Sequence, residues 1–564
     1  MVKINKHSSI FSLLLIFAGL FYTGQGSLQA CTNFLVTKGA STDGSTMISY
    51  AADSHVLYGE LYFDPAGTHK EGSMLDIYEW DTGKYLGEIP QVSETYSVVG
   101  NMNEFQVVIG ETTYGGRSEL RDPEGIMDYG SLMYIALQRS KSAREAIKII
   151  TELVETHGYY SSGESFSIAD KDEVWIMEMI SKGEEEKGAV WVARMIPDGY
   201  VSAHANQARI TTFPLQEENN WFDKSQTTFH ASDVIDFARK MDYFDGEDED
   251  FSFSDTYAPV DFGGARFCEI RVWSFFKDIH SGMEKHLDYA KGNIERGSHD
   301  YATNRMPLWI EPEEKLSVHD VMNSMRDHLE GTELDMSKGP GAGGFGIPYR
   351  WRPLTWDVED ETYVNERATA TQQTGFSFVS QSRNWLPDAI GGLYWFSVDD
   401  AASTVYTPIY CGAKQIPERY SEGYGSLMEY KQDAAFWIFN RVAHLAYLFY
   451  DRVHPDIHKK QQALETKYIN YTPAIDRAAT ELYKKDQELG TQFITDYSLN
   501  TANSLLDEWS DFYEYLFTKY MDGNIKRPNP EQQNPHVKQP GYKESFYQRI
   551  IEETGDKFKY RDAE

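Results

Sequence analysis

The sequence predicts an α+β fold followed by a helical C-terminal region, and three observations support this prediction. Over residues 31–209, short apolar runs alternate with turn signals such as Asp43-Gly44-Ser45, a pattern typical of strands. Within this part, residues 128–157 place apolar side chains at helical spacing. Residues 427–520 have a helical pattern throughout and are rich in Trp, Phe and Leu. Strands and helices in one body indicate layers that share a core.

Residues 1–30 are predicted to be a signal peptide. Two early lysines precede the apolar run 10–22, which is too short to span a bilayer comfortably. A stretch of small and polar side chains follows and ends at Ala30, a suitable residue for a cleavage site. Cleavage there makes Cys31 the first residue of an exported chain, located in a bacterial periplasm or outside the cell.

The order Leu28-Gln29-Ala30-Cys31 also resembles a lipoprotein signal, in which the cysteine thiol is lipidated. In this alternative the protein is a lipid-anchored surface binding protein without enzymatic activity. However, the strand-like run 32–36 begins directly after Cys31, whereas lipid-anchored domains usually begin with a polar tether. A terminal cysteine that leads directly into a buried strand indicates a functional residue in a folded site. Its α-amine, with a reference pKa near 8, is a general base beside the thiol.

The charge composition excludes one class of partner. The chain carries 87 Asp and Glu against 53 Lys and Arg, a formal net charge of −34. A surface of this sign repels nucleic-acid phosphates and anionic membranes, so we expect no nucleic-acid partner. No stretch after the signal peptide is long and apolar enough for stable membrane insertion. The composition leaves the oligomeric state open, a homo-oligomer included.

Cysteine and histidine usage argues against a disulfide scaffold and a metal site. The chain has three cysteines, Cys31, Cys268 and Cys411, so at least one lies outside any intramolecular pair. No paired-cysteine or His-Glu-x-x-His spacing occurs, and no metal or other cofactor is expected. His55 and His204 lie near the motifs described next and are expected to be hydrogen-bonded structural residues.

A series of short motifs follows Cys31 in a fixed order. They are Cys31-Thr32-Asn33, Thr42-Asp43-Gly44-Ser45, Ala52-Asp53-Ser54, Asn103-Glu104, Gly110-Glu111-Thr112-Thr113, Gly163-Glu164-Ser165-Phe166, the run 204–210, Thr371-Gln372-Gln373-Thr374 and the run 399–404. In this order the motifs resemble peptidase family C69, the dipeptidase A-like members of the N-terminal nucleophile (Ntn) hydrolases. Penicillin V acylases and bile salt hydrolases are relatives of that family. The resemblance covers roughly residues 31 to 415.

The resemblance implies roles for individual residues. Cys31 is the expected nucleophile, with its own α-amine as base, and Asp53 matches the aspartate that holds this amine. Asn206 matches an asparagine that stabilises the oxyanion of the tetrahedral intermediate. Arg266 matches an arginine close to the thiol, where a cation favours thiolate, and Arg271 is its rival. The alternative interpretations are that Asp53 is an ordinary turn residue, that Asn206 is an ordinary loop residue and that Arg266 forms a surface ion pair.

Two positions depart from the pattern of these relatives. Tyr50 stands where they carry an arginine, three residues before Asp53, and Thr113 stands where the acylases carry a second asparagine. The second oxyanion donor is then a backbone N–H or the Thr113 hydroxyl. Glu111 or Asp53 can supply the carboxylate that a dipeptidase needs to hold a substrate ammonium. Tyr50, Glu111 and Thr113 are therefore expected to bind substrate.

The resemblance implies an αββα Ntn sandwich followed by a C-terminal helical region. The expected divisions are a signal peptide at 1–30, a catalytic domain at 31–425, a helical region at 426–525 and an irregular tail at 526–564. The implied function is an exported cysteine dipeptidase that hydrolyses dipeptides or short peptides through a thioester. An N-acyl amide hydrolase with an apolar pocket is the alternative enzyme.

Overall fold

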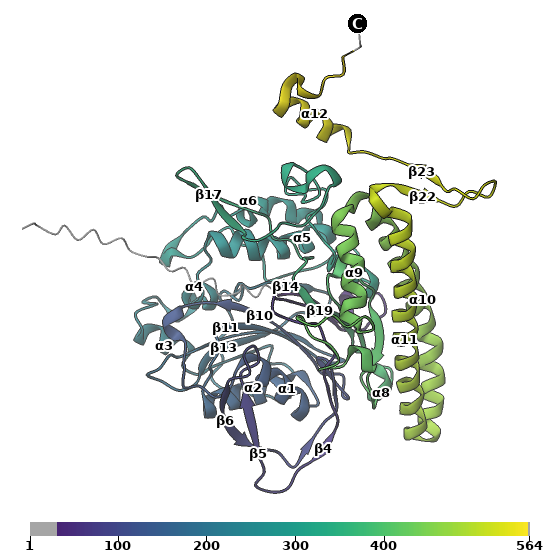
Figure 1. Ribbon diagram of the computed structural model, residues 1–564. Helices are drawn as coiled ribbons and strands as arrows, with labels where there is room; N and C mark the ends of the chain where they lie inside the picture. Colours follow the sequence, from purple (N-terminus) through teal and green to yellow (C-terminus); the bar gives the residue numbers. More distant parts are fainter. Residues whose placement is uncertain (1–30, 562–564) are drawn as a thin grey trace, which may run out of the picture.

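Two large antiparallel sheets form the centre of the protein (Figure 1). The computed structural model describes residues 31–561, and the predicted signal peptide lies outside them. The seven-stranded sheet has the spatial order β16 (Trp309–Ile310), β14 (Val201–His204), β1 (Thr32–Val36), β2 (Met47–Asp53), β19 (Thr374–Gln381), β20 (Leu393–Val398) and β21 (Thr407–Tyr410). The eight-stranded sheet has the order β15 (Thr228–His230), β13 (Ala189–Met195), β12 (Val174–Ser181), β11 (Gly163–Ala169), β10 (Val108–Gly115), β9 (Met102–Asn103), β8 (Val98–Val99) and β3 (Phe63–Asp64).

The central strands are buried along their whole length. Every residue of β1, β2, β11, β12, β19 and β20 is buried. Strands covered on both faces have near-continuous apolar runs instead of a strict alternation, because neither face meets water. The two sheets contact each other where β1 and β2 lie against β10 and β11. The start of β1 is thereby enclosed in the middle of the molecule.

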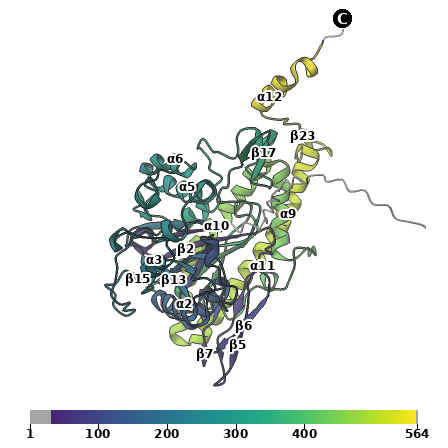
Figure 2. The same cartoon turned by 90° about the vertical axis from the view of Figure 1, so that its left-hand side faces the viewer.

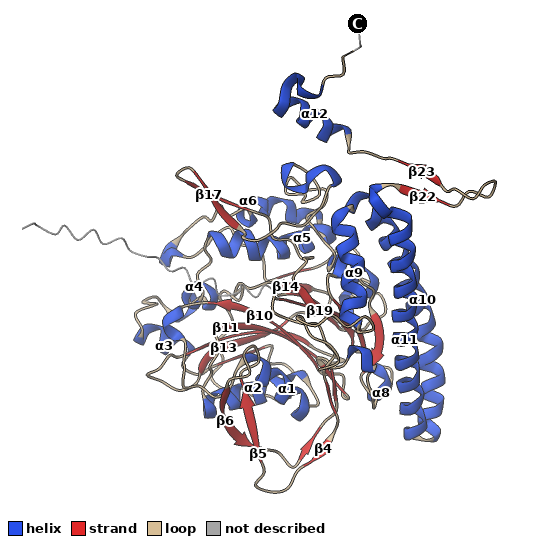
Figure 3. Ribbon diagram, viewed as in Figure 1, coloured by secondary structure: helices blue, strands red, loops and turns tan. Residues whose placement is uncertain are grey.

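Helices cover the outer faces of both sheets (Figure 3). α1 (Tyr129–Arg139) and α2 (Ala143–His157) pack on the eight-stranded sheet, and α5 (Ile270–Ile279) and α7 (Val318–Ser324) pack on the seven-stranded sheet. The sequence predicts one helical segment over 128–157, but the structure has two helices. The chain leaves helical geometry at Ser140, and the Ser142 side chain accepts a hydrogen bond from the Glu145 N–H to start α2.

Three long helices form the predicted C-terminal helical region. They are α9 (Ala435–Leu448), α10 (Tyr450–Lys485) and α11 (Gln487–Tyr520). All three run alongside one another and pack against β20 and β21, at one end of the seven-stranded sheet (Figures 1 and 2). Buried Trp509, Leu505 and Phe439 belong to the same apolar core as the strands. The α+β class with a helical C-terminal region is therefore confirmed.

The remaining elements are short. Paired short strands are β4 (Gly67–Thr68) with β7 (Glu94–Thr95), β5 (Met74–Tyr78) with β6 (Tyr85–Pro90), β17 (Thr355–Val358) with β18 (Glu361–Val364), and β22 (Ile525–Arg527) with β23 (His536–Lys538). The other α-helices of the described residues are α3 (Val234–Lys240), α4 (Phe253–Tyr257), α6 (Leu287–Ala290), α8 (Asp388–Gly391) and α12 (Glu544–Thr554). Within residues 31–561, none of the helices combines the length and the apolar character needed to cross a bilayer.

The tail differs from the expected irregular segment, since it contains β22, β23 and α12. α12 extends away from the body in Figure 1 and has no buried residue. Its base is held by Tyr542, whose ring lies 5.0 Å from the ring of Phe345. The periodicity of a single short helix among Pro, Asn and Gln residues is a weak signal, which explains the difference.

Candidate active site

Cys31 lies directly before β1, beside the end of β2. The register pairs Thr32 with Ala51 and Asn33 with Tyr50, so the antiparallel ladder brings residue 31 next to Ala52 and Asp53. Cys31 is only 5% exposed. It lines a cavity of about 210 Å³ together with aromatic rings and four carboxylates, those of Asp53, Asp81, Glu111 and Glu422.

The thiol of Cys31 contacts an acid and a phenol. Its Sγ lies 3.6 Å from Oε1 of Glu111 and 3.7 Å from the hydroxyl of Tyr50. The Tyr50 hydroxyl in turn donates a hydrogen bond to Glu111. Burial raises the pKa of the Cys31 thiol well above its usual value, and the negative charges of Glu111 and Asp53 raise it further. The thiol is therefore neutral in this arrangement.

Asp53 is held by two buried partners from a distant part of the chain. Its Oδ2 accepts a hydrogen bond from Arg367 at 2.5 Å, and its Oδ1 accepts one from the hydroxyl of Thr374 at 2.6 Å. Thr374 is also the cross-strand neighbour of Asp53 in the pairing of β2 with β19. Burial raises the pKa of Asp53, and the Arg367 cation offsets part of that rise. Arg367 and Thr374 together fix the orientation of the Asp53 carboxylate.

Asn206 follows β14 in the left-handed backbone region, with a φ of 60° that asparagine tolerates better than most residues. Its Nδ2 donates to the carbonyl of Thr113 at 2.7 Å, and its Oδ1 accepts from Arg271 at 2.9 Å. The same guanidinium donates to the carbonyl of Cys31 and to the hydroxyl of Thr32. Arg271 thus connects Asn206 to the backbone of residue 31.

Arg266 has different neighbours. It lies in a π-helical turn at Gly264–Glu269, directly before α5, and forms an ion pair with Glu366 at 3.7 Å. Among residues 31–561, the polar contacts of Arg266 do not include Cys31. Of the two arginines that the resemblance offers, the structure brings Arg271 next to Cys31.

Glu111 and Glu164 form a buried carboxyl pair on neighbouring strands. Oε2 of Glu111 and Oε1 of Glu164 are both inaccessible to water. Within the described residues, neither oxygen accepts a hydrogen bond from an amide, a hydroxyl or a cation. They share a hydrogen bond with each other, and burial together with the charge of Glu111 raises the pKa of Glu164 well above its usual value. Glu164 therefore holds the shared proton. The Thr113 hydroxyl donates to the other oxygen of Glu164 at 2.9 Å.

Both histidines near the motifs have environments that do not favour a charge. His204 is fully buried and bridges the two sheets, with Nδ1 2.7 Å from the Thr112 hydroxyl and Nε2 2.7 Å from the Ser167 hydroxyl. Burial lowers the pKa of His204 to about 3, so it is a neutral structural residue, as predicted. Burial and the nearby cations Arg352 and Arg367 lower the pKa of His55.

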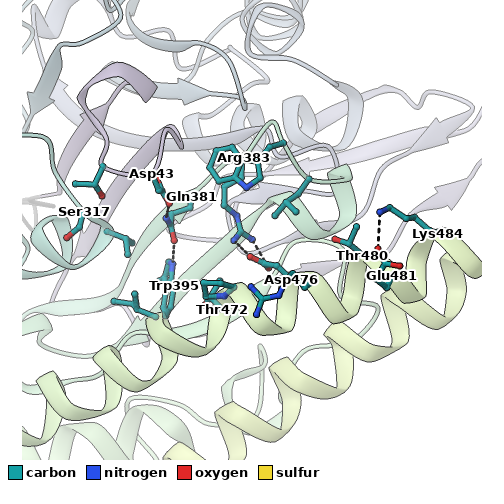
Figure 4. A pocket seen from close by; sticks show the side chains of 17 residues that line it. Asp43, Ser317, Gln381, Arg383, Trp395, Thr472, Asp476, Thr480, Glu481 and Lys484 are labelled. Carbon is teal, nitrogen blue, oxygen red and sulfur yellow. Dashed lines mark hydrogen bonds and ion pairs between the residues drawn. The ribbon is translucent and has the colours of Figure 1, made fainter.

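A larger cavity lies on the other side of the sheet, against α10 (Figure 4). It has a volume of about 660 Å³. Its buried arginine is paired, since Arg383 donates to Asp476 at 2.6 Å and so joins the segment after β19 to α10. Gln381, at the end of β19, donates to the exposed Asp43 at 2.9 Å. Within the described residues, no group of three His, Cys, Asp or Glu side chains could hold a metal ion.

The family model described as peptidase family C69 matches residues 30–66 and 60–463, which is most of the chain. The chain belongs to peptidase family C69. The sequence contains the motifs of this family in order. Membership of the family identifies the protein as a peptidase.

Curated relatives of this C69 chain carry dipeptidase names. A probable dipeptidase from Salmonella dublin is 24% identical over 414 residues, covering 69% of this chain and 83% of the relative. A probable dipeptidase from Latilactobacillus sakei is 24% identical over 525 residues, covering 88% and 97%. Dipeptidase A from Lactobacillus helveticus is 24% identical over 439 residues, covering 74% and 81%.

Three residues at this C69 site have no role predicted from the sequence. Arg367 follows Glu366 and lies four residues before Thr371-Gln372-Gln373-Thr374, and only the pairing of β19 with β2 brings it to Asp53. Glu164 lies within a recognised motif, but its approach to Glu111 depends on the register of β10 and β11, which places Glu164 opposite Thr113. Asp81 lies in a turn after β5 and has no sequence signal.

Proposed function

We propose that this protein is an exported cysteine dipeptidase that hydrolyses dipeptides or short peptides with a free N-terminus. Cys31 is the nucleophile, acting as the first residue after residues 1–30 have been removed. The observation that carries the proposal is the position of Cys31: a buried thiol at the start of a central strand, in a small cavity lined by four carboxylates. Family membership and the names of the relatives support the same reaction.

The base in this proposal is created by removing residues 1–30. In the full chain the nitrogen of Cys31 belongs to a peptide bond with Ala30, and an amide nitrogen is not basic. Cleavage after Ala30 leaves an α-amine with a reference pKa near 8 beside the thiol. Asp53, fixed by Arg367 and Thr374, orients this amine. The amine takes the thiol proton, the thiolate attacks the substrate carbonyl, and the C–N bond breaks as the proton passes to the leaving amine. Water then hydrolyses the thioester.

Asn206 supplies the side-chain donor to the oxyanion in this mechanism. A side-chain amide has two N–H bonds, and Thr113 accepts one of them, which leaves the second for the substrate. Arg271 is the positioning residue, since it holds Oδ1 of Asn206 and the carbonyl of Cys31. The second oxyanion donor is a backbone N–H, because the Thr113 hydroxyl donates to Glu164.

The charges of the cavity favour a peptide over an N-acyl amide. Four carboxylates line it, and Tyr129 orients Asp81 by a 3.0 Å hydrogen bond. Carboxylates stabilise the ammonium of a free N-terminus, whereas an acyl chain needs an apolar wall. Glu111 is the proposed partner of the ammonium, with Tyr50 holding its Oε1. The volume of about 210 Å³ fits a small substrate.

The proposal extends to the fold and the domains. The two stacked sheets with helices on both sides support an αββα Ntn sandwich. We propose that this sandwich occupies residues 31–425, with a helical region at 426–525 and a tail at 526–564. Removal of residues 1–30 on export completes the active site in this scheme.

A substrate screen tests the proposed function. Protein that begins at Cys31 is incubated with unmodified dipeptides, with the same dipeptides N-acetylated, and with N-acyl amino acids. Release of free amino acids from the unmodified dipeptides alone is the expected result, because acetylation removes the ammonium. Faster hydrolysis of the N-acyl amino acids would contradict the dipeptidase assignment. Mass spectrometry of the native N-terminus tests the lipid-anchored alternative, which requires a diacylglyceryl adduct on Cys31.

A further inference from the structure

A second cavity adjoins the one at Cys31 and has no assigned role. It has a volume of about 650 Å³ and lies between α9, α11 and the segments that follow β2 and precede β19. Ser54 and Leu57 line both cavities, so the two cavities adjoin at these residues. A substrate bound at Cys31 and extended past Leu57 would enter this second cavity.

The wall formed by the two helices is aromatic. Trp437 on α9 packs 5.5 Å from the ring of Tyr430, and Tyr513 on α11 stacks 5.9 Å from Phe517. Tyr430 is 59% exposed and Phe517 is 51% exposed, although both line the cavity. Large apolar side chains gathered at the mouth of a cavity mark a binding site more often than isolated ones do.

Arg441 provides the positive charge of this cavity. Its guanidinium lies 4.8 Å from the ring centre of Tyr513. Its Nε is inaccessible to water and, among residues 31–561, has no hydrogen-bond partner. The ion pairs of the described residues do not include Arg441, although the chain carries a net charge of −34. A cation without a carboxylate partner is unusual in so acidic a protein.

The one acidic side chain among the residues lining this cavity does not neutralise Arg441. Asp399 is 2% exposed, and its Oδ1 accepts a hydrogen bond from Asn440 at 3.0 Å. Burial and the neighbouring charge of Asp400 raise the pKa of Asp399 to about 8, so it is mostly uncharged at neutral pH. The cavity is therefore positive, next to a Cys31 cavity that is negative.

We propose that the second cavity is a subsite for the leaving end of peptides longer than two residues, in which Arg441 binds the C-terminal carboxylate and the aromatic wall packs against the last side chain. This inference rests on the proposed function. The opposite charges of the two cavities orient a peptide: its ammonium lies among the carboxylates at Cys31 and its carboxylate lies at Arg441. Arginine suits this role because its planar fork binds carboxylates in a bidentate manner.

Three substrates test the subsite: Ala-Ala, Ala-Ala-Phe and Ala-Ala-Phe amide, each assayed for release of the first alanine. The wild type should cleave Ala-Ala-Phe with a kcat/KM about tenfold above that of its amide, since a lost charge-assisted hydrogen bond costs about that factor or more. The Arg441→Gln variant should lose this preference, and Arg441→Lys should keep part of it. Arg477→Gln is the matched control, because Arg477 is an exposed arginine on α10 that lines the cavity of Figure 4.

The outcomes separate the subsite from the proposed function. Equal rates on the acid and the amide in the wild type, or a preference that survives in Arg441→Gln, overturn the subsite while Ala-Ala cleavage leaves the function intact. Cleavage of none of the three contradicts the function. Calorimetric binding of the two tripeptides then decides the subsite, which requires tighter binding of the acid. Thermal unfolding of Arg441→Gln within a few degrees of the wild type shows that the variant is folded.

Discussion

Oδ1 of Asn206 accepts a 2.9 Å hydrogen bond from Arg271. This contact fixes which side of the Asn206 amide carries the oxygen, so Nδ2 faces Thr113 and the space beside it. Arg271 also donates to the carbonyl of Cys31, and one guanidinium therefore sets the distance between the proposed nucleophile and the proposed oxyanion donor. An ammonium group has no planar fork and cannot make both contacts in the same geometry.

The first prediction follows from this relationship. Arg271→Lys should lower kcat by about a hundredfold to a thousandfold, the range expected when an oxyanion donor is lost, with a smaller effect on KM. Arg266→Lys should change kcat less than twofold, because Arg266 is paired with Glu366. Steady-state kinetics on one dipeptide compares the two. A larger loss in the Arg266 variant would restore the assignment that the family resemblance implies.

The second prediction concerns the nucleophile. Cys31→Ala should abolish turnover and leave the melting temperature nearly unchanged, because a small group is removed beside a cavity. Cys268→Ala and Cys411→Ala should remain active. Burial raises the pKa of Cys411 to about 12, so this thiol is inert. Iodoacetamide labelling followed by mass spectrometry provides the check. Inactivation that correlates with labelling of Cys268 while Cys31 stays unmodified would refute the assignment.

The third prediction is that removal of residues 1–30 activates the thiol. Burial, Glu111 and Asp53 raise the pKa of Cys31 in the full chain, so alkylation of this form should stay slow up to high pH. The new α-ammonium supplies a positive charge beside the sulfur and lowers the pKa of Cys31 toward neutrality. The rate of iodoacetamide labelling, measured against pH for both forms, should rise at a lower pH in the shortened protein. Full activity in protein that keeps residues 1–30 would exclude the amine as base.

The sequence predicts the fold class well because its signals are local. The apolar runs of β1 and β12 and the periodicity of α9 and α11 each lie within one continuous segment of the chain. The break between α1 and α2 was missed, since it depends on Ser142 acting as an N-cap within a continuous apolar pattern. A capping serine has the same appearance as any surface serine until the helix ends are known.

The candidate site also contains some residues with local sequence signals and others whose contacts depend on the fold. Motifs predict Cys31, Asp53 and Asn206, but they do not decide between Arg266 and Arg271. Arg266 lies in the π-helical turn before α5 and pairs with Glu366, whereas Arg271 lies within α5 and donates to the carbonyl of Cys31, and these partners come from distant parts of the chain. Arg367 reaches Asp53 through pairing between strands more than 300 residues apart, which no local pattern encodes.

The fourth prediction tests the ion pair of Asp53 with Arg367. Arg367→Met should lower the free energy of unfolding by about 3 to 5 kcal/mol, because it leaves a buried carboxylate without its cation. Activity should also fall, since Asp53 then takes up a proton and no longer attracts the α-amine. Denaturant unfolding and dipeptide kinetics give both readouts. The double variant Arg367→Met with Asp53→Asn should recover part of the stability and none of the activity, and recovery of activity would contradict the role of Asp53.

The last prediction separates the two acids of the buried pair. Glu164→Gln should keep activity, because the amide N–H can replace the shared proton and donate to Glu111. Glu111→Gln should raise KM for dipeptides by about tenfold or more, since the charge that binds the substrate ammonium is gone.

The pKa of Glu164 is raised in the folded protein, so the folded state binds more protons than the unfolded state above the ordinary glutamate pKa of about 4.3. Its stabilising contribution is complete below that pH and is lost as the pH rises through the folded pKa. Glu164→Gln removes this loss, and its stability relative to the wild type should therefore increase from pH 5 to pH 8. Chemical unfolding at several pH values measures the difference, and a difference that is constant with pH would show that Glu164 is ionised in the fold.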